Sequence, residues 1–486
     1  MKKIFNNPWS LILLSAWLLA GLTGCKKFLS EPLPAGTISQ DNAFVSDNAV
    51  SAVVTGNFLQ LIADGPFSGS GSSNLTYCAG LYTDELQYLN LGASGTDPQL
   101  FYLDDIQTST VNYWTYMYNQ IYDVNSALQG IQTTSADLYY KNQWLGESYF
   151  TRALIYFYLT NLYGPVPLAL TTNASANNAL SRTPQTQVCQ QIVADLQQAR
   201  SLLNYGYTSA YGAATSDRVR PNRYAATGLL AKTWLYMQQW DSAEVAADSV
   251  IANTSTYALA PVSSAFSANG NETLWALEPT QGSETEDYQL YYNGMPAPIP
   301  AGDYPGTYQV YAFLDTALVN SFEPGDTRLT NWVRVDSVAG TSPATKYYFP
   351  NKYNTSSLTA QDQVILRMGD IYLIRAEARA EQGNISGAQA DLNAVRTRAG
   401  LPNTTASDQT SLLAAIAHER RVELFAEEGN RFFDLKRWGT IDSVMTAFTP
   451  TKIGGAAWQD YMQLMPIPTN DLLQDPSITA NPGYQQ

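Results

Sequence analysis

Aromatic and apolar residues recur at helical spacing along much of this 486-residue chain. The clearest run covers about residues 143–163. Its apolar and aromatic positions include Leu145, Tyr149, Tyr156, Leu159 and Tyr163. A spacing of about three or four residues brings such side chains onto one face of an α-helix. Gly164 and Pro165 follow directly, and both residue types end helices. We therefore predict a long helix here.

Two later segments repeat a helix–turn–helix plan. A helix over residues 222–237 is followed, beyond a turn near Trp240, by a second helix, and a helix over residues 364–382 is followed by another after Gly383. Each pair spans about 34 residues, the length of a tetratricopeptide repeat, in which paired helices stack into a curved solenoid. Alanine-rich helical hairpins also occur in ordinary bundles, so both architectures stay open from the pattern alone. Four tryptophans on helical patterns are assigned to the core: Trp114, Trp144, Trp234 and Trp240.

Two stretches, residues 63–110 and 253–360, lack this periodicity. Gly, Pro, Ser, Thr and Tyr dominate the longer one. A loop-rich insertion of such length is typically functional rather than filler. We expect the ligand-binding part of the protein at about residues 253–360.

The first residues resemble a bacterial lipoprotein signal. Lys2 and Lys3 precede a short apolar run, which ends in the sequence LTGC with Cys25 as its last residue. In such signals, cleavage leaves a lipid-modified cysteine as the new N-terminus. We expect a cleaved signal at 1–24, a lipidated tether at 25–40 that starts with Cys25, and a single domain at 41–486. An uncleaved membrane helix is disfavoured, because the apolar run is shorter than the roughly 20 residues that a bilayer needs.

Acidic residues outnumber basic ones in the chain, 42 to 27. Loss of residues 1–24 removes Lys2 and Lys3, so 25 basic residues remain and the net charge becomes −17. A surface this negative repels nucleic acid, and we exclude nucleic-acid binding. Besides Cys25, the chain has Cys78 and Cys189, which allow one disulfide but do not require it.

Several sequence blocks are spread over nearly the whole chain. Beside the lipoprotein signal, they include GESYFTRALIYFYL at 146–159, RPNRYAA at 220–226, LRMGDIYLIRAEA at 366–378, LNAVRTRAGLP at 392–402, HERRVEL at 418–424, RFFDLKRWG at 431–439, PIP at 466–468 and NPGY at 481–484. Together these blocks resemble the SusD/RagB family of outer-membrane nutrient-binding lipoproteins. The order and spread of the blocks make the resemblance specific, although no single block would suffice.

The resemblance implies a mainly α fold, with a scaffold of tetratricopeptide-like helix pairs and a long loop-rich insertion. It also implies a lipid-anchored protein on the outer surface of the outer membrane. Members of the family act as the lid of a SusC-like TonB-dependent transporter and capture oligosaccharides or, in some cases, peptides. No cofactor is expected. These blocks belong to the scaffold, so they say little about the ligand.

Candidate ligand-binding residues are sought in the loop-rich segments. Sugar binding needs aromatic planes for the apolar faces of the rings and polar side chains for the hydroxyl groups. Residues of these types are Tyr77, Tyr82, Asp84, Glu85, Tyr88, Asn90, Trp275, Tyr291, Tyr292, Tyr308 and Trp332. We select Tyr82, Asp84, Tyr88, Trp275, Tyr291 and Trp332 as the candidate site. The alternatives are that such aromatics pack inside the protein and that Asp84 and Glu85 cap a helix. If the six bind a glycan, Trp275→Ala or Trp332→Ala should weaken its retention with little effect on the melting temperature.

The only histidine, His418, lies beside acidic residues, but a zinc site usually needs more than one imidazole or thiolate. Arg420 with Glu423, and Glu427 with Arg431, have the spacing of salt bridges along one helix. We therefore assign this segment to structure and expect no metal. An Asp/Asn-rich loop that holds a structural calcium ion stays an alternative, although no EF-hand spacing is present.

No nucleophile elbow, metal-binding histidine pair or phosphate-binding glycine loop is present. Any chain with 42 acidic residues can supply two carboxylates at glycosidase spacing, so the sequence alone leaves that activity open. We expect a binding protein rather than an enzyme. A surface scaffold without a ligand is a further alternative, which would gain support if Trp275 or Trp332 were buried.

Overall fold

The computed structural model describes residues 42–63, 66–67, 74–89, 96–109, 113–279, 284–357 and 360–484. The signal at 1–24, the lipidation of Cys25 and the tether at 25–40 lie outside the described residues, as does Asn90, and these assignments stay predictions.

Helices dominate the fold, which confirms the predicted mainly α class. The first half contains α2 (Asp47–Ala63), α3 (Leu75–Tyr82), α4 (Asp97–Tyr102), α5 (Tyr113–Thr133), α6 (Lys141–Tyr163), α7 (Ala174–Asn177), α8 (Gln185–Leu202), α9 (Arg223–Tyr236) and α10 (Trp240–Ile251). The second half contains α11 (Glu286–Tyr291), α12 (Thr316–Val319), α13 (Thr327–Asn331), α14 (Met368–Glu381), α15 (Ile385–Arg398), α16 (Gln409–Glu423), α17 (Asn430–Arg437), α18 (Ile441–Phe448) and α19 (Thr469–Gln474). Short 3₁₀ helices are η2 (Val262–Ser264), η3 (Pro305–Tyr308), η4 (Thr449–Thr451) and η5 (Asp460–Gln463).

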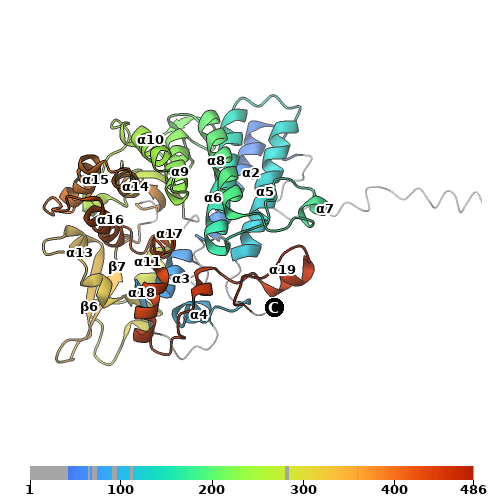
Figure 1. Ribbon diagram of the computed structural model, residues 1–486. Helices are drawn as coiled ribbons and strands as arrows, with labels where there is room; N and C mark the ends of the chain where they lie inside the picture. Colours follow the sequence, from blue (N-terminus) through green and yellow to red (C-terminus); the bar gives the residue numbers. More distant parts are fainter. Residues whose placement is uncertain are drawn as a thin grey trace, which may run out of the picture.

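The long helices form a layer in which neighbours along the chain are also neighbours in space. Helix α5 packs on α6, α6 on α8, α8 on α9, α9 on α10, and α10 on α14, which in turn packs on α15 and α16. Figure 1 shows this row from α5 and α2 through α8 and α9 to α14 and α15. The predicted pairs are present as α9 with α10 and α14 with α15. This serial packing is consistent with the stacked helix pairs of a tetratricopeptide-like scaffold.

The scaffold core is built from small and branched side chains. A separate cluster between α14, α15 and α16 contains Leu373, Ala376, Ala388, Leu392, Leu412 and Ile416. Of the four tryptophans assigned to the core, Trp114 and Trp144 are buried, whereas Trp234 and Trp240 are half-buried and pack against the core from outside.

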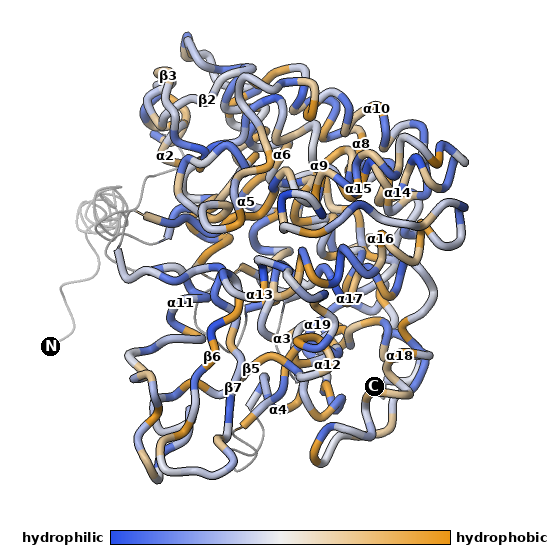
Figure 2. The backbone as a smooth tube through the Cα atoms, turned by 90° about the vertical axis from the view of Figure 1, so that its left-hand side faces the viewer, coloured by the Kyte–Doolittle hydropathy of each residue, from blue (hydrophilic) through white to orange (hydrophobic). Residues whose placement is uncertain are grey.

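Within the described residues, the strands form four antiparallel pairs. They are β1 (Leu86–Tyr88) with β5 (Ala312–Leu314), β2 (Tyr207–Thr208) with β3 (Ala214–Thr215), β4 (Thr273–Leu277) with β8 (Gln363–Arg367), and β6 (Val333–Ser337) with β7 (Lys346–Pro350). Figure 2 places β2 and β3 at the end of the molecule opposite to β6 and β7. The segment 253–360, predicted to be loop-rich, therefore also contains short strands and helices.

The prediction of a continuous helix over residues 364–382 is wrong at its start. Strand β8 ends at Arg367 and α14 begins at Met368. In β8, Leu366 lies opposite Trp275 of β4, and the whole strand is buried. A short apolar run that is buried on both faces has no strand or helix period of its own, so its partner decides its structure.

Candidate functional site

The structure places all six selected ligand-binding candidates in the interior. Tyr82, Asp84, Tyr88, Trp275, Tyr291 and Trp332 are each at most 6% exposed. A ligand could reach them only by displacing packed protein atoms. Burial favours the packing alternative for these residues, and their assignment to a ligand site stays a prediction.

Trp275 and Trp332 show what these aromatic side chains do. The ring of Trp275 lies 4.9 Å from that of Phe150, and its Nε1 donates a hydrogen bond of 3.2 Å to the carbonyl of Val219. The Nε1 of Trp332 donates a bond of 2.8 Å to the carbonyl of Val262. With both indoles packed and satisfied, the expectation that their removal spares the melting temperature is reversed, because truncating a buried tryptophan leaves a cavity.

Asp84 is held by two arginines rather than presented to a ligand. Its Oδ1 accepts a bond of 2.7 Å from Nε of Arg431, and its Oδ2 accepts one of 2.7 Å from Nη2 of Arg421. Burial alone would raise the pKa of Asp84, but the two guanidinium groups outweigh it and lower the pKa. Because Asp84 lies beyond the last residue of α3, it does not cap the start of that helix.

Tyr292 and Tyr308, also named as candidates, are half-buried. The ring of Tyr292 stacks on Tyr288 with a centroid distance of 4.7 Å, and the guanidinium of Arg334 lies over the ring at 3.9 Å. A stacked ring and a cation above the same ring occupy opposite faces. Tyr292 therefore has no open face for a sugar.

The segment around His418 is structural, but its salt bridges are not the predicted local ones. Arg420 pairs with Asp370 and Asp434, at 2.9 and 2.7 Å. Glu427 pairs with Arg367 at 2.7 Å, and Arg431 pairs with Asp84. The predicted pairs Arg420–Glu423 and Glu427–Arg431 are wrong, because these side chains point into the interior, where charged groups from other elements meet them.

Glu423 is the centre of this interior charge cluster. Its carboxylate accepts bonds from Arg328 of α13 at 2.8 Å and from Arg367 of β8 at 2.6 Å, and it also pairs with Arg398 of α15. The three arginines hold its pKa well below the ordinary value against the opposing effect of burial. A side chain at Gly369 would place its Cβ 2.6 Å from Oε1 of Glu423. The cluster joins the helical scaffold to the insertion.

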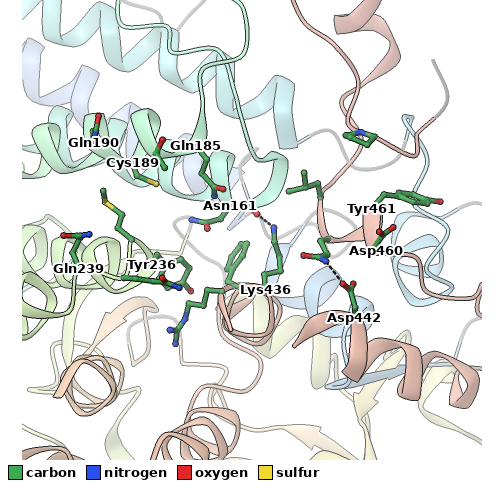
Figure 3. Close-up of a pocket in the computed structure, with 18 residues that line it drawn as sticks. Asn161, Gln185, Cys189, Gln190, Tyr236, Gln239, Lys436, Asp442, Asp460 and Tyr461 are labelled. Atoms are coloured by element: carbon green, nitrogen blue, oxygen red, sulfur yellow. Dashed lines mark hydrogen bonds between the residues drawn. The ribbon is translucent and has the colours of Figure 1, made fainter. Parts of the chain in front are cut away.

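The best candidate site is a pocket of about 980 Å³ between the scaffold and the C-terminal part of the chain. Figure 3 shows its walls: Gln185, Cys189 and Gln190 come from α8, Tyr236 from α9, Lys436 from α17, Asp442 from α18, and Asp460 and Tyr461 from η5. Its size lies within the roughly 300–1,000 Å³ of ligand pockets. We call it the η5 pocket.

Amide side chains are the most numerous type of polar group that lines the η5 pocket. The amides are Asn161, Gln185, Gln190, Gln238, Gln239 and Gln463. Gln463 donates to Asp442 at 2.7 Å. The side chains of Gln190 and Gln239 form no hydrogen bond with the described residues, so their donors and acceptors are open to a ligand. Paired donors and acceptors on amides suit a ligand with many hydroxyl groups.

The two cations of the pocket are already engaged. Lys436 donates to the carbonyl of Asn161, as the dashed line in Figure 3 marks, and burial lowers its pKa to about 7. Arg437 binds Glu377 and Asp434. The cations are therefore poor partners for an acidic ligand.

Sequence reasoning missed this pocket. Its residues come from α6, α8, α9, α17, α18 and η5, which are far apart in the chain, and the helical ones follow no pattern that differs from an ordinary solvated face. The fold alone brings them together.

No disulfide joins Cys78 to Cys189 in the structure. Within the described ranges, no group of three or more His, Cys, Asp or Glu side chains is arranged to hold a metal ion. A search of the same residues found no helix with the length and apolar character needed to span a membrane.

Known proteins resemble this chain in sequence and in fold. A family model described as the SusD family matches residues 106–484. The chain therefore belongs to the SusD family. SusD-like protein P2 of Formosa agariphila is 25% identical over an alignment of 523 positions, gaps included, which covers 96% of this chain and 98% of that protein. The starch-binding protein SusD of Bacteroides thetaiotaomicron is 31% identical over 126 residues, 26% of this chain and 22% of that protein.

Solved structures agree with the fold. A SusD superfamily protein from Bacteroides thetaiotaomicron has a TM-score of 0.73 at 22% identity, with 90% of this chain and 100% of that chain covered. A laminarin-binding SusD-like protein has a TM-score of 0.70 at 24% identity, with 90% and 99% covered. At these identities the likeness shows the shared fold alone.

Proposed function

We propose that this protein is a cell-surface lipoprotein that binds an extracellular glycan and delivers it to a SusC-like TonB-dependent outer-membrane transporter. The observation that carries the proposal is the SusD family match over residues 106–484. Relatives with this fold are named for binding starch and laminarin. The open amides of the η5 pocket add a chemical reason, since they can pair with sugar hydroxyl groups.

Binding without catalysis is part of the proposal. A glycosidase needs two carboxylates about 5–9 Å apart, one of them a free acid. In the η5 pocket, Asp442 already accepts bonds from Gln463 and from Trp458, at 2.7 and 2.8 Å. Asp460 would have to act with a partner that is already occupied, so the geometry favours a binding site.

The anchor and the transporter complete the proposed role. A lipid on Cys25 would hold the protein at the outer face of the outer membrane, and the transporter would supply the energy for uptake. Capture of a peptide or another nutrient by the same lid mechanism is the alternative ligand class.

A surface scaffold without a ligand is the second candidate function. It is favoured by one observation, the burial of Trp275 and Trp332, which a ligand-binding insertion would have used as platforms. The two candidates differ in whether any glycan is retained.

Affinity electrophoresis of the lipid-free protein, residues 26–486, through gels that contain plant, fungal and host polysaccharides tests the proposal. Retardation by one class of glycan supports it and identifies the cargo. Equal mobility in every gel contradicts glycan capture, and a peptide panel then separates the other nutrient class from the scaffold.

A further inference from the structure

Two pockets meet at one aromatic side chain. Tyr461 lines the η5 pocket and also a second pocket of about 610 Å³. The second pocket is lined on its other sides by residues that include 104–108, 456–457, 459 and 483–484. Each hollow has the volume of a ligand pocket. Tyr461 therefore separates two sites that a single elongated molecule could occupy together.

The ring of Tyr461 is held in place by backbone and by a second ring. It lies on Gly483, where a Cβ atom would come within 2.2 Å of the ring, and it meets Tyr484 edge-on at 5.0 Å. Tyr484 donates a bond of 2.7 Å to the carbonyl of Leu464. Asn481 fixes the same segment through a bond of 2.8 Å to the carbonyl of Met465. A half-buried ring with this support can bind without first being ordered.

Among the described residues, the charged side chains beside the ring of Tyr461 that form no ion pair are all negative. Asp460 lines the η5 pocket and Asp105 lines the second pocket, both are exposed, and neither forms an ion pair within the described part of the chain. Lys452, near the second pocket, is bound to Asp104 at 2.8 Å. With Lys436 and Arg437 also engaged, the open charges on the two pockets are carboxylates. An acidic ligand would meet repulsion there.

We propose that Tyr461 is the aromatic platform of a two-part site, in which a neutral oligosaccharide lies across the ring with one end in the η5 pocket and the other in the second pocket. The inference rests on the proposed function and names the substrate class: a neutral glycan chain long enough to fill both pockets. The ring supplies the stacking surface, and the exposed amides of Gln239 and Gln459 on either side supply hydrogen bonds.

Isothermal titration calorimetry of residues 26–486 tests this with trisaccharides and heptasaccharides of the malto-, laminari- and cello- series and with oligogalacturonate as the acidic probe. We expect a neutral heptasaccharide to bind more tightly than the trisaccharide of its series. Tyr461→Ala should weaken binding of the heptasaccharide about tenfold or more, the loss typical of an aromatic anchor. Tyr461→Phe keeps the ring and should bind within about twofold of the parent protein.

Two blocking variants keep the test independent of folding at Tyr461. Gln239→Trp fills the η5 pocket and Gln459→Trp fills the second pocket, and both start from exposed residues. Each should reduce the affinity for the heptasaccharide toward that for the trisaccharide. Tyr211→Ala, at a tyrosine that is 77% exposed and remote from both pockets in sequence, is the matched control and should leave binding unchanged.

The outcomes separate the two proposals. If neither Tyr461→Ala nor the blocking variants change the binding of the heptasaccharide, the two-part site is overturned and glycan capture still stands. Tighter binding of oligogalacturonate than of every neutral probe overturns the neutral class. If the parent protein binds none of the probes, both this inference and the proposed glycan function are overturned.

Discussion

Replacing Glu423 by glutamine tests whether the interior charge cluster holds the scaffold to the insertion. The side chain of Glu423 is 0% exposed and binds three arginines. Removing one partner of a buried ion pair costs about 3–5 kcal/mol. Arg328 keeps Asp326 and Arg367 keeps Glu427. The remaining carboxylates soften the loss, and we expect the lower end, about 3 kcal/mol.

Urea unfolding followed by circular dichroism measures this loss as a lower midpoint for Glu423→Gln. Glu323→Gln is the matched control, because Glu323 also binds an arginine, Arg396 at 2.6 Å, but its side chain is 36% exposed. A pair at that exposure is worth less than about 1 kcal/mol. Because the three arginines lower the pKa of Glu423, its contribution is present at neutral pH and is lost as the pH falls toward that lowered pKa. The deficit of the variant should therefore shrink in acid. Equal midpoints for the two variants at neutral pH would show that the charge cluster at Glu423 does not hold the scaffold to the insertion.

Three further predictions concern other parts of the chain. Trp275→Ala should destabilise the fold by about 3–5 kcal/mol, because it leaves a cavity in the core. Its melting temperature should fall, whereas that of the control Tyr211→Ala should not. A melting temperature of Trp275→Ala like that of the parent protein would contradict the packing role. Burial, aided by Glu286, raises the pKa of Asp287 to about 7, so the native state holds a proton there and stability falls as the pH rises from about 4 to 7. Asp287→Asn should match the parent protein at or below about pH 4, where the carboxyl group is protonated in both the folded and the unfolded state, and exceed its melting temperature at about pH 8. Equal melting temperatures of the two proteins at about pH 8 would exclude this role. Cys25→Ala should release the protein from membranes, and an unchanged membrane fraction would contradict lipidation.

The helices were predictable because their side chains carry the pattern themselves. The run predicted over 143–163 corresponds to α6, and the predicted pair after Pro221 corresponds to α9 and α10. The start of the segment predicted as a helix over 364–382 is instead strand β8, since a buried apolar run takes its structure from the strand beside it. Local periodicity thus predicts elements whose buried face is set by their own sequence.

The candidate site was less predictable, because burial is a property of the whole fold. Trp275 and Trp332 belong to a loop-rich region, but that region folds back so that both side chains join the core. Arg420 and Glu423 have the spacing of a helical salt bridge, yet stronger partners reach them from distant elements. The sequence around Tyr461 did not indicate a binding site, since the second pocket forms only when residues 104–108 and 483–484 meet η5.

Hydrogen–deuterium exchange of the protein in the presence of the neutral polysaccharide that retards it most tests directly for a glycan site at Tyr461. The glycan should slow exchange in η5 and its flanks, residues 459–464, and in residues 482–484. Slower exchange in the insertion at 284–357 alone, or no change anywhere, would contradict a glycan site at Tyr461.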